Sequence, residues 1–307
     1  MFGILSPIEE LFNSSGPFFH LYTKGIEDEV VFASEKDYAM VNNIIALAIS
    51  QSNCRILAMS IMSNHLHFIL EGSPETCLSF FELIIVQLRR YYIRHGNGRV
   101  IEQMKPELQP ISNLMQLRNE IAYVIRNPFV ARNDVNPLAY KWCSGYLYFN
   151  PLLDTSGIDL NSLSMRAFYA FSGSRLLEKP AEGAISVKDG VANPASFIDY
   201  KRAMSFYEDA RQFLYFVFKN IEGQIEASRR LGELPKLNDL EMLSLSFKLC
   251  RTMFRVASTK DLPDDKKKKL ALKLKNEFCA SNKQIARCVN LSLLEVNELF
   301  PLSAPSQ

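Results

Sequence analysis

The sequence predicts an α+β protein in two folded parts: an antiparallel sheet with helices on one face, followed by an all-α part. The first observation is the order of its patterns, because strand-like and helical runs follow one another as βαββαβα through the first 150 residues. The second is that beyond residue 194 the apolar residues keep helical spacing alone. The third is composition, since 307 residues with 48% apolar and 22% charged are typical of a globular protein with room for two domains.

The first 150 residues are expected to form one domain of strands and helices. In chain order these are a strand at 18–23, a helix at 35–52, strands at 55–62 and 65–70, a helix at 74–94, a strand at 99–104 and a helix that ends at Asn127. Ser34 is a suitable N-cap for the first helix, and Ser63-Asn64 is a turn-like pair that favours a hairpin. The last helix should stop before Pro128, because a residue that precedes proline is pushed out of the helical region. The aromatic-rich segment 140–149 is expected to be another strand or a closing segment.

The rest of the chain is predicted to be a linker and a helical domain. Scattered glycines and prolines with weak periodicity indicate a linker at 151–195 that contains a short helix near 165–172. Residues 196–307 are expected to be helical and to end in a helix-turn-helix, with helices at 264–278, 282–289 and 293–300. The last of these helices has no Lys or Arg to contact a phosphate or a guanine, so DNA contact and a packing role both stay open.

Two histidines stand one residue apart in a predicted strand, within Asn64-His65-Leu66-His67-Phe68. Side chains alternate between the faces of a strand, so His65 and His67 should point the same way while Leu66 and Phe68 point into a core. Two imidazoles on one face can hold a divalent cation if a third ligand comes from elsewhere. A half-buried strand with two polar residues facing outward gives the same pattern, so the pair alone leaves both readings open.

A second candidate segment is the predicted helix that carries Tyr123 and Asn127. These residues are four apart and therefore share one face of the helix. If that face lies over the two histidines, Asn127 supplies a carbonyl oxygen as third ligand and Tyr123 lies near the metal. Mixed nitrogen and oxygen ligands suit Mg²⁺ or Mn²⁺ with positions open for phosphate oxygens. The tyrosine hydroxyl would then attack the scissile phosphate and form a phosphotyrosyl intermediate.

Other residues near these motifs have more ordinary interpretations. Tyr91 and Tyr92 are rival nucleophiles, but neither has an Asn or Gln four residues later, so Tyr123 is preferred. Glu120 lies three residues before Tyr123, so it could approach the metal, but a charge on the helix surface is the preferred interpretation. His20 in the first strand is expected to be structural or solvent-facing.

Together these motifs resemble the HUH single-tyrosine transposases, specifically the branch of REP-associated tyrosine transposases. The resemblance covers residues 15–150 and is carried by His65-Leu66-His67 and by Tyr123 followed by Asn127-Pro128. It is supported by Phe19-His20-Leu21-Tyr22 and by Pro137 with Tyr140 and Trp142 in the family's order and spacing.

The resemblance implies a ferredoxin-like HUH domain that acts on single-stranded DNA, often a hairpin from a repeated palindromic element. It implies Tyr123 as the nucleophile of a 5′-phosphotyrosine link that leaves a free 3′-hydroxyl. It also implies a divalent metal, Mg²⁺ or Mn²⁺, held by His65, His67 and Asn127.

The charge distribution is compatible with a DNA partner, although the net charge is only +2 and a basic domain is the usual sign of nucleic-acid binding. Residues 89–141 carry nine Lys/Arg against four Asp/Glu, whereas residues 1–88 carry three against ten. Positive charge is therefore concentrated around the tyrosine helix. Arg89, Arg90 and Arg126 are the candidates for contact with DNA phosphates.

The candidate site residues support one leading hypothesis and two rivals. The leading hypothesis is a metal-dependent endonuclease and strand transferase that cleaves single-stranded or hairpin DNA through Tyr123. The second is a domesticated protein that binds DNA hairpins and is catalytically silent. The third is an unrelated α+β protein in which the four site residues are a coincidence and lie apart.

Composition also bears on location and on partners. No apolar run approaches the length of a membrane span, and the start lacks the features of a secretory signal. The six cysteines have no ligand spacing and are expected to be buried, reduced thiols. We therefore expect a cytoplasmic protein without a membrane partner, associated with the nucleoid when it is bound to DNA. Monomer and homodimer both stay open.

Overall fold

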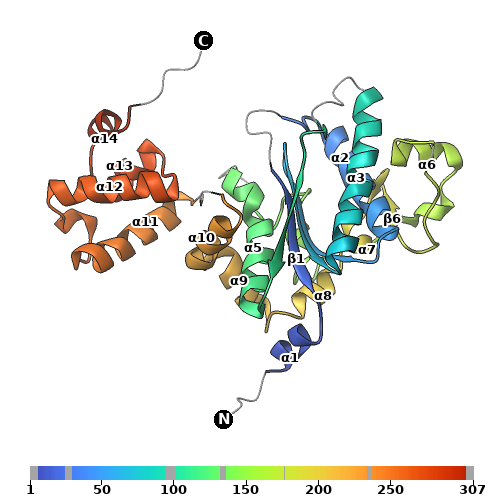
Figure 1. Cartoon of the computed structure of the whole chain (residues 1–307), viewed down its shortest axis with the longest axis horizontal. Helices are drawn as coiled ribbons and strands as arrows, with labels where there is room; N and C mark the ends of the chain where they lie inside the picture. Colours follow the sequence, from blue (N-terminus) through green and yellow to red (C-terminus); the bar gives the residue numbers. More distant parts are fainter. Residues whose placement is uncertain are drawn as a thin grey trace. The chain divides into compact units, whose positions relative to one another are not determined.

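Four strands from the first half of the chain pair into one antiparallel sheet (Figure 1). They are β1 (Phe18–Thr23), β2 (Arg55–Ile61), β3 (Leu66–Glu71) and β4 (Pro106–Ile111), in the order β2-β3-β1-β4. The sequence of strands and helices is compatible with the expected ferredoxin-like arrangement. The computed structural model describes residues 6–24, 30–94, 101–131, 136–175, 177–233, 235 and 237–301.

The edge strand β4 lies further along the chain than predicted. The prediction of a strand at 99–104 is wrong for the described residues 101–104, which form a turn that buries Ile101 and Met104. The strand itself contains Pro106 and Pro110, residues that argue against a central strand. Both are tolerated because β4 pairs with β1 alone, so its outer edge needs no donor.

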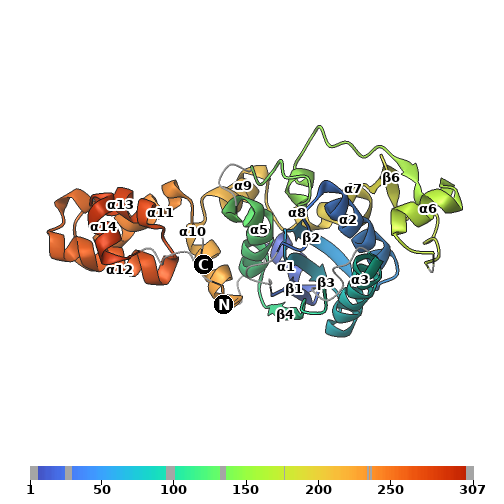
Figure 2. The ribbon, with the colours of Figure 1, turned by 90° about the horizontal axis from the view of Figure 1, so that it is seen from above.

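Helices cover both faces of the sheet, which corrects the expectation of one covered face (Figure 2). Helices α2 (Glu35–Ser50) and α3 (Pro74–Arg94) lie on one face, where Phe68 packs edge-on against Phe80 of α3 at 5.3 Å. Helix α5 (Leu114–Ala131) lies on the other face, where the neighbouring His67 contacts Tyr123. All six residues of β1 and of β3 are buried, so both of their faces need a cover.

Helix α5 continues through Pro128, so the prediction that it stops before this proline is wrong. A proline inside a helix leaves the carbonyl four residues earlier without its usual donor. Here the thiol of Cys143 lies 3.9 Å from the Val124 carbonyl oxygen and 3.6 Å from that of Ile125, and it donates there instead. Burial raises the pKa of Cys143 to about 12, which keeps the thiol protonated. Cys143 belongs to the segment 140–149, which contains a 3₁₀ turn at Ser144–Leu147 and does not form another strand.

Residues 151–195 fold against α2 and do not form the predicted linker. They contain α6 (Met165–Ser172), as predicted, and a small antiparallel sheet of β5 (Ile158–Asp159), β6 (Ser186–Lys188) and β7 (Val191–Ala192). Asn43 on α2 anchors them: its amide nitrogen donates to the carbonyls of Phe171 and Gly190, and its amide oxygen accepts from the Ala192 N–H at 2.8 Å. Strands of two or three residues are too short to show a period, which is why the sequence reads as a linker.

The chain divides into two compact units after Lys219, whereas the sequence suggests domains at 1–150 and 196–307. The first unit therefore also contains α1 (Pro7–Asn13), α7 (Pro194–Phe197), α8 (Tyr200–Met204) and α9 (Ala210–Phe218). Phe206 and Phe213 of this stretch are buried in the core that includes the sheet, and Phe213 stacks on Tyr148 at 5.1 Å. Apolar residues at helical spacing thus correctly predict helices within 196–219. The spacing does not specify which core such a helix joins.

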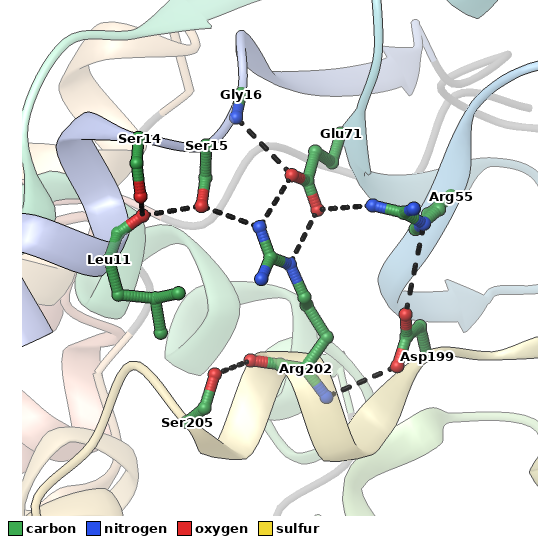
Figure 3. Close-up of polar contacts among 9 residues, drawn as sticks. All are labelled: Leu11, Ser14, Ser15, Gly16, Arg55, Glu71, Asp199, Arg202 and Ser205. Atoms are coloured by element: carbon green, nitrogen blue, oxygen red, sulfur yellow. Dashed lines mark hydrogen bonds and ion pairs between the residues drawn. The ribbon is translucent and has the colours of Figure 1, made fainter.

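A polar cluster fastens α8 to the sheet and to the end of α1 (Figure 3). Arg202 of α8 donates to both carboxylate oxygens of Glu71 on β3, at 3.0 and 2.9 Å, and also to the Ser15 hydroxyl. Glu71 accepts in addition from the Gly16 N–H at 3.2 Å, and Arg55 lies 3.6 Å away. Burial opposes the charge of Glu71, but the hydrogen bonds from Arg202 and Gly16 outweigh it, so its pKa lies below the ordinary value.

We expect Glu71→Gln to lower the free energy of unfolding by about 1–3 kcal/mol at pH 7, because it leaves the Arg202 guanidinium without its counter-charge. When folding lowers the pKa of a carboxyl group, that group stabilises the folded protein at pH values above its unfolded-state pKa. This contribution is lost as pH falls through the folded-state pKa. The difference between the variant and the parent should therefore shrink as pH falls below the ordinary glutamate value of 4.5. Urea unfolding at pH 7 and at acid pH measures this difference in the free energy of unfolding.

Glu35→Gln, in an exposed pair with Lys141, is the matched control, and its free energy of unfolding should stay close to that of the parent. An equal loss at both pH values would contradict the assignment.

The second unit, residues 220–307, is a set of short helices around its own core. They are α10 (Ile221–Arg230), α11 (Asp239–Leu249) with a π-helical turn at Cys250–Phe254, α12 (Asp264–Phe278), α13 (Asn282–Val289) and α14 (Leu293–Leu299). Helices α12 and α13 have the predicted bounds, and Asn290, which caps the end of α13, takes the left-handed conformation at φ 57°. Cys279 is exposed, which corrects the expectation that all cysteines are buried. Within the described ranges, none of the helices combines the length and the apolar character that a membrane crossing requires.

Candidate functional site

The two histidines lie at the start of β3, with their ring centroids 4.9 Å apart. His67 is on the strand and is completely buried. His65 immediately precedes the strand and is half-buried, and its Nδ1 is 2.7 Å from the Asn64 side-chain oxygen. Leu66 and Phe68 are buried in the core, as the alternation predicts. The turn at 63–64 thus places one accessible imidazole beside one enclosed imidazole.

Helix α5 brings Tyr123 and Asn127 to the same place. The Asn127 side-chain nitrogen donates to His67 Nε2 at 2.9 Å, and the Tyr123 ring centroid lies 5.9 Å from that of His67. Tyr123 is half-buried, so part of its side chain is open to solvent. A separation of more than about 10 Å between the histidines and Asn127 would favour the coincidence hypothesis, because one shared ion needs ligand bonds near 2 Å. The hydrogen bond between Asn127 and His67 does not favour it.

A buried chain of polar side chains continues behind His67, and the sequence interpretation missed it. His67 Nδ1 lies 3.0 Å from His20 Nε2, and His20 Nδ1 lies 2.8 Å from a carboxylate oxygen of Glu120. His20 is 0% exposed and Glu120 is 1% exposed, so Glu120 is not the surface charge expected. One signal was present in the sequence, since Glu120, Tyr123 and Asn127 are spaced three and four apart on one helix face.

The donor set of His65, His67 and Asn127 fits a divalent cation of the expected kind. It offers two imidazole nitrogens, from His65 and His67, and the amide oxygen of Asn127 after a half-turn of the side chain. Mixed nitrogen and oxygen ligation with positions left open suits Mg²⁺ or Mn²⁺. In the part of the chain that is described, no group of three or more His, Cys, Asp or Glu could hold a metal, so an ion here depends on the Asn127 amide.

The rival tyrosines are poorly placed for chemistry. Tyr91 and Tyr92 are buried on α3, on the face of the sheet opposite to α5. Tyr92 donates to the Val31 carbonyl at 3.3 Å. Burial raises the pKa of both phenols, which disfavours the phenolate that would attack a phosphate.

The three arginines predicted to contact phosphates do not gather at the site. Arg89 and Arg90 are exposed on α3, across the sheet from Tyr123. Arg126 is on α5 beside Asn127, but at 2% exposure its side chain is enclosed by protein. Contact of these residues with DNA stays a prediction, and in this conformation Arg126 is not open to a nucleic-acid backbone.

Comparison with known proteins gives one partial likeness. No family model and no curated protein matches the sequence. Among solved structures, that of a REP-associated tyrosine transposase bound to a REP hairpin is similar to 43% of this chain over 79% of its own length. The two are 13% identical, with a TM-score of 0.34. At this identity and TM-score the likeness carries no argument about chemical activity.

Proposed function

We propose that this chain is a metal-dependent nuclease and strand transferase that cleaves single-stranded or hairpin DNA through Tyr123. The observation that carries the proposal is the meeting of a half-buried tyrosine with the His65, His67 and Asn127 donor set on one face of the sheet. The same residues carry the sequence resemblance to the HUH single-tyrosine transposases. The finer parts of that resemblance, a ferredoxin-like HUH domain and a 5′-phosphotyrosine link, are included in the proposal.

The proposed reaction exchanges one phosphate ester for another. A divalent cation held by His65, His67 and Asn127 would polarise the scissile phosphate and offset its charge. Tyr123 Oη forms a bond to phosphorus while the bond from phosphorus to the 3′-oxygen breaks. The phenol gives up its proton and the departing 3′-oxygen gains one, which leaves a 5′-phosphotyrosine and a free 3′-hydroxyl. Attack by a 3′-hydroxyl on the phosphotyrosine reverses these steps and completes strand transfer.

The C-terminal helices are included in the proposal as a helix-turn-helix. Helix α14 has no Lys or Arg, and its Glu295 is engaged in capping the helix through Ser292. Carboxylates repel the phosphate backbone, so α14 is a weak candidate for reading DNA. We propose that the α12–α14 group serves mainly as a packing module.

The second candidate is a hairpin-binding protein that does not cleave. It is favoured by the weak net charge and by the burial of Arg126, whose side chain is not open to a phosphate backbone. It predicts stable binding of a hairpin without turnover in the presence of Mn²⁺.

A labelled-DNA experiment tests the proposal. The full chain is incubated with Mn²⁺ and single-stranded or hairpin oligonucleotides labelled at either end, and the products are separated under denaturing conditions. We expect the 3′-labelled fragment to stay attached to protein and the 5′-labelled fragment to be released with a free 3′-hydroxyl. Mass spectrometry of the adduct should place the DNA on the peptide that contains Tyr123. Hairpin binding without an adduct would favour the silent protein, and linkage to another residue would overturn the assignment.

A further inference from the structure

We infer that His20 and Glu120 are positioning residues that fix the proton of His67 on Nδ1 and keep its Nε2 unprotonated, as the nitrogen that would bind the cation. This inference rests on the proposed metal site. It concerns two buried residues, on β1 and α5, that lie behind the proposed ligands. The His20 ring also packs edge-on against the Tyr123 ring, with centroids 6.0 Å apart.

The direction of the hydrogen bonds follows from the chemistry of the groups. A carboxylate can only accept, so the contact of 2.8 Å between Glu120 and His20 Nδ1 places a proton on that nitrogen. A neutral His20 then has its lone pair on Nε2, and it accepts from His67 Nδ1–H across 3.0 Å. The lone pair of His67 is consequently on Nε2. The Asn127 side-chain nitrogen independently supports this arrangement, because it can only donate and it lies 2.9 Å from that atom.

Burial makes this arrangement restrictive. Imidazoles in water exchange between tautomers because solvent can serve either nitrogen. His20, His67 and Glu120 are 0–1% exposed, so solvent has little access to their ring and carboxylate atoms. Tyr22 lies nearly parallel to the His67 ring, with centroids 5.9 Å apart, and covers it on that side. A partner that holds the second nitrogen of a metal-binding imidazole typically changes metal affinity by about 10–100-fold.

The test compares tautomer and Mn²⁺ affinity in the full chain and two variants, Glu120→Gln and His20→Phe. Glutamine keeps the size of Glu120 but can either donate or accept, so it no longer dictates the proton on His20. Phenylalanine removes the acceptor for His67. The chain has only four histidines, so long-range ¹H–¹⁵N NMR of histidine-labelled protein in EDTA resolves which ring nitrogen of His67 is protonated. Electron paramagnetic resonance measures Mn²⁺ binding, and thermal unfolding in EDTA shows that each variant is folded.

We expect the parent to carry the proton on Nδ1 of His67, and Glu120→Gln to lose this single tautomer and to bind Mn²⁺ about 10–100-fold more weakly. The matched control is Glu107→Gln, the same substitution on β4, where Glu107 pairs with Lys24 at the surface. This variant should keep the parent's His67 tautomer and Mn²⁺ affinity. If Glu120→Gln keeps both tautomer and affinity while the parent binds Mn²⁺, this inference alone is overturned. If the parent does not bind Mn²⁺, the proposed metal site fails, and this inference fails with it. Should His20→Phe not fold, Glu120→Gln decides the question.

Discussion

Replacing Tyr123 by Phe should abolish the covalent protein–DNA adduct and reduce cleavage on the order of 10⁶-fold, the scale of loss that follows removal of a covalent nucleophile. Only the hydroxyl is removed, and the ring that lies 6.0 Å from His20 and 5.9 Å from His67 is retained. Tyr123 is half-buried, so the variant should fold and should bind hairpin DNA and Mn²⁺ as the parent does. The adduct is measured on a denaturing gel with 3′-labelled DNA.

Tyr91→Phe is the matched control for this experiment. It removes the same hydroxyl from a buried tyrosine on the other face of the sheet, and the adduct should form at the parent's rate. An adduct that survives Tyr123→Phe and is lost in Tyr91→Phe would transfer the nucleophile to α3 and overturn the proposed site.

The second large effect is expected at His67. His67→Gln should weaken Mn²⁺ binding and slow adduct formation on the order of 10²–10⁴-fold, because the loss of a ligand removes several kcal/mol of charge stabilisation. It should also lower the free energy of unfolding, since His67 is buried and bonded to both His20 and Asn127. Mn²⁺ titration and adduct kinetics measure the first effect, and urea unfolding in EDTA measures the second.

His65→Gln separates metal binding from stability. His65 is half-buried at the edge of β3 and contacts Asn64, so its loss should weaken Mn²⁺ binding with little change in unfolding. If both histidine variants form the adduct at the parent's rate while remaining folded, the proposed metal site is wrong. If they lose stability but keep Mn²⁺ affinity, the two histidines have a structural role alone.

Much of the local structure could be predicted because it depends on residues close in sequence. Period-two and helical spacing gave β1, α2, β2, β3 and α3 within a few residues of their observed ends. A capping residue, Ser34, correctly indicated the start of α2. The pairing of Tyr123 with Asn127 is a property of one helix turn, and it needed no tertiary information.

Other features depend on partners distant in sequence, and local patterns do not encode them. Pro128 ends a helix by local rules, yet α5 continues past it, and a thiol from residue 143 lies at the carbonyl oxygens of 124 and 125. Residues 151–195 are predicted to be a linker because the hydrogen bonds that hold them come from Asn43, more than a hundred residues earlier. The edge position of β4 is set by its pairing with β1. The local sequence does not indicate this pairing, because the prolines within β4 argue against a strand.

By itself the sequence determined β1, α2, β2, β3 and α3, their order, and the four residues of the candidate site, because these follow from short-range spacing and from the chemistry of each side chain. Only the tertiary structure decided that α5 covers the opposite face from α3 and lies over His67. It also decided that Glu120 and His20 lie behind the site. The physical reason is that burial and directed hydrogen bonds arise when distant segments pack together, and a helical or strand period records which face is apolar but not which partner covers it.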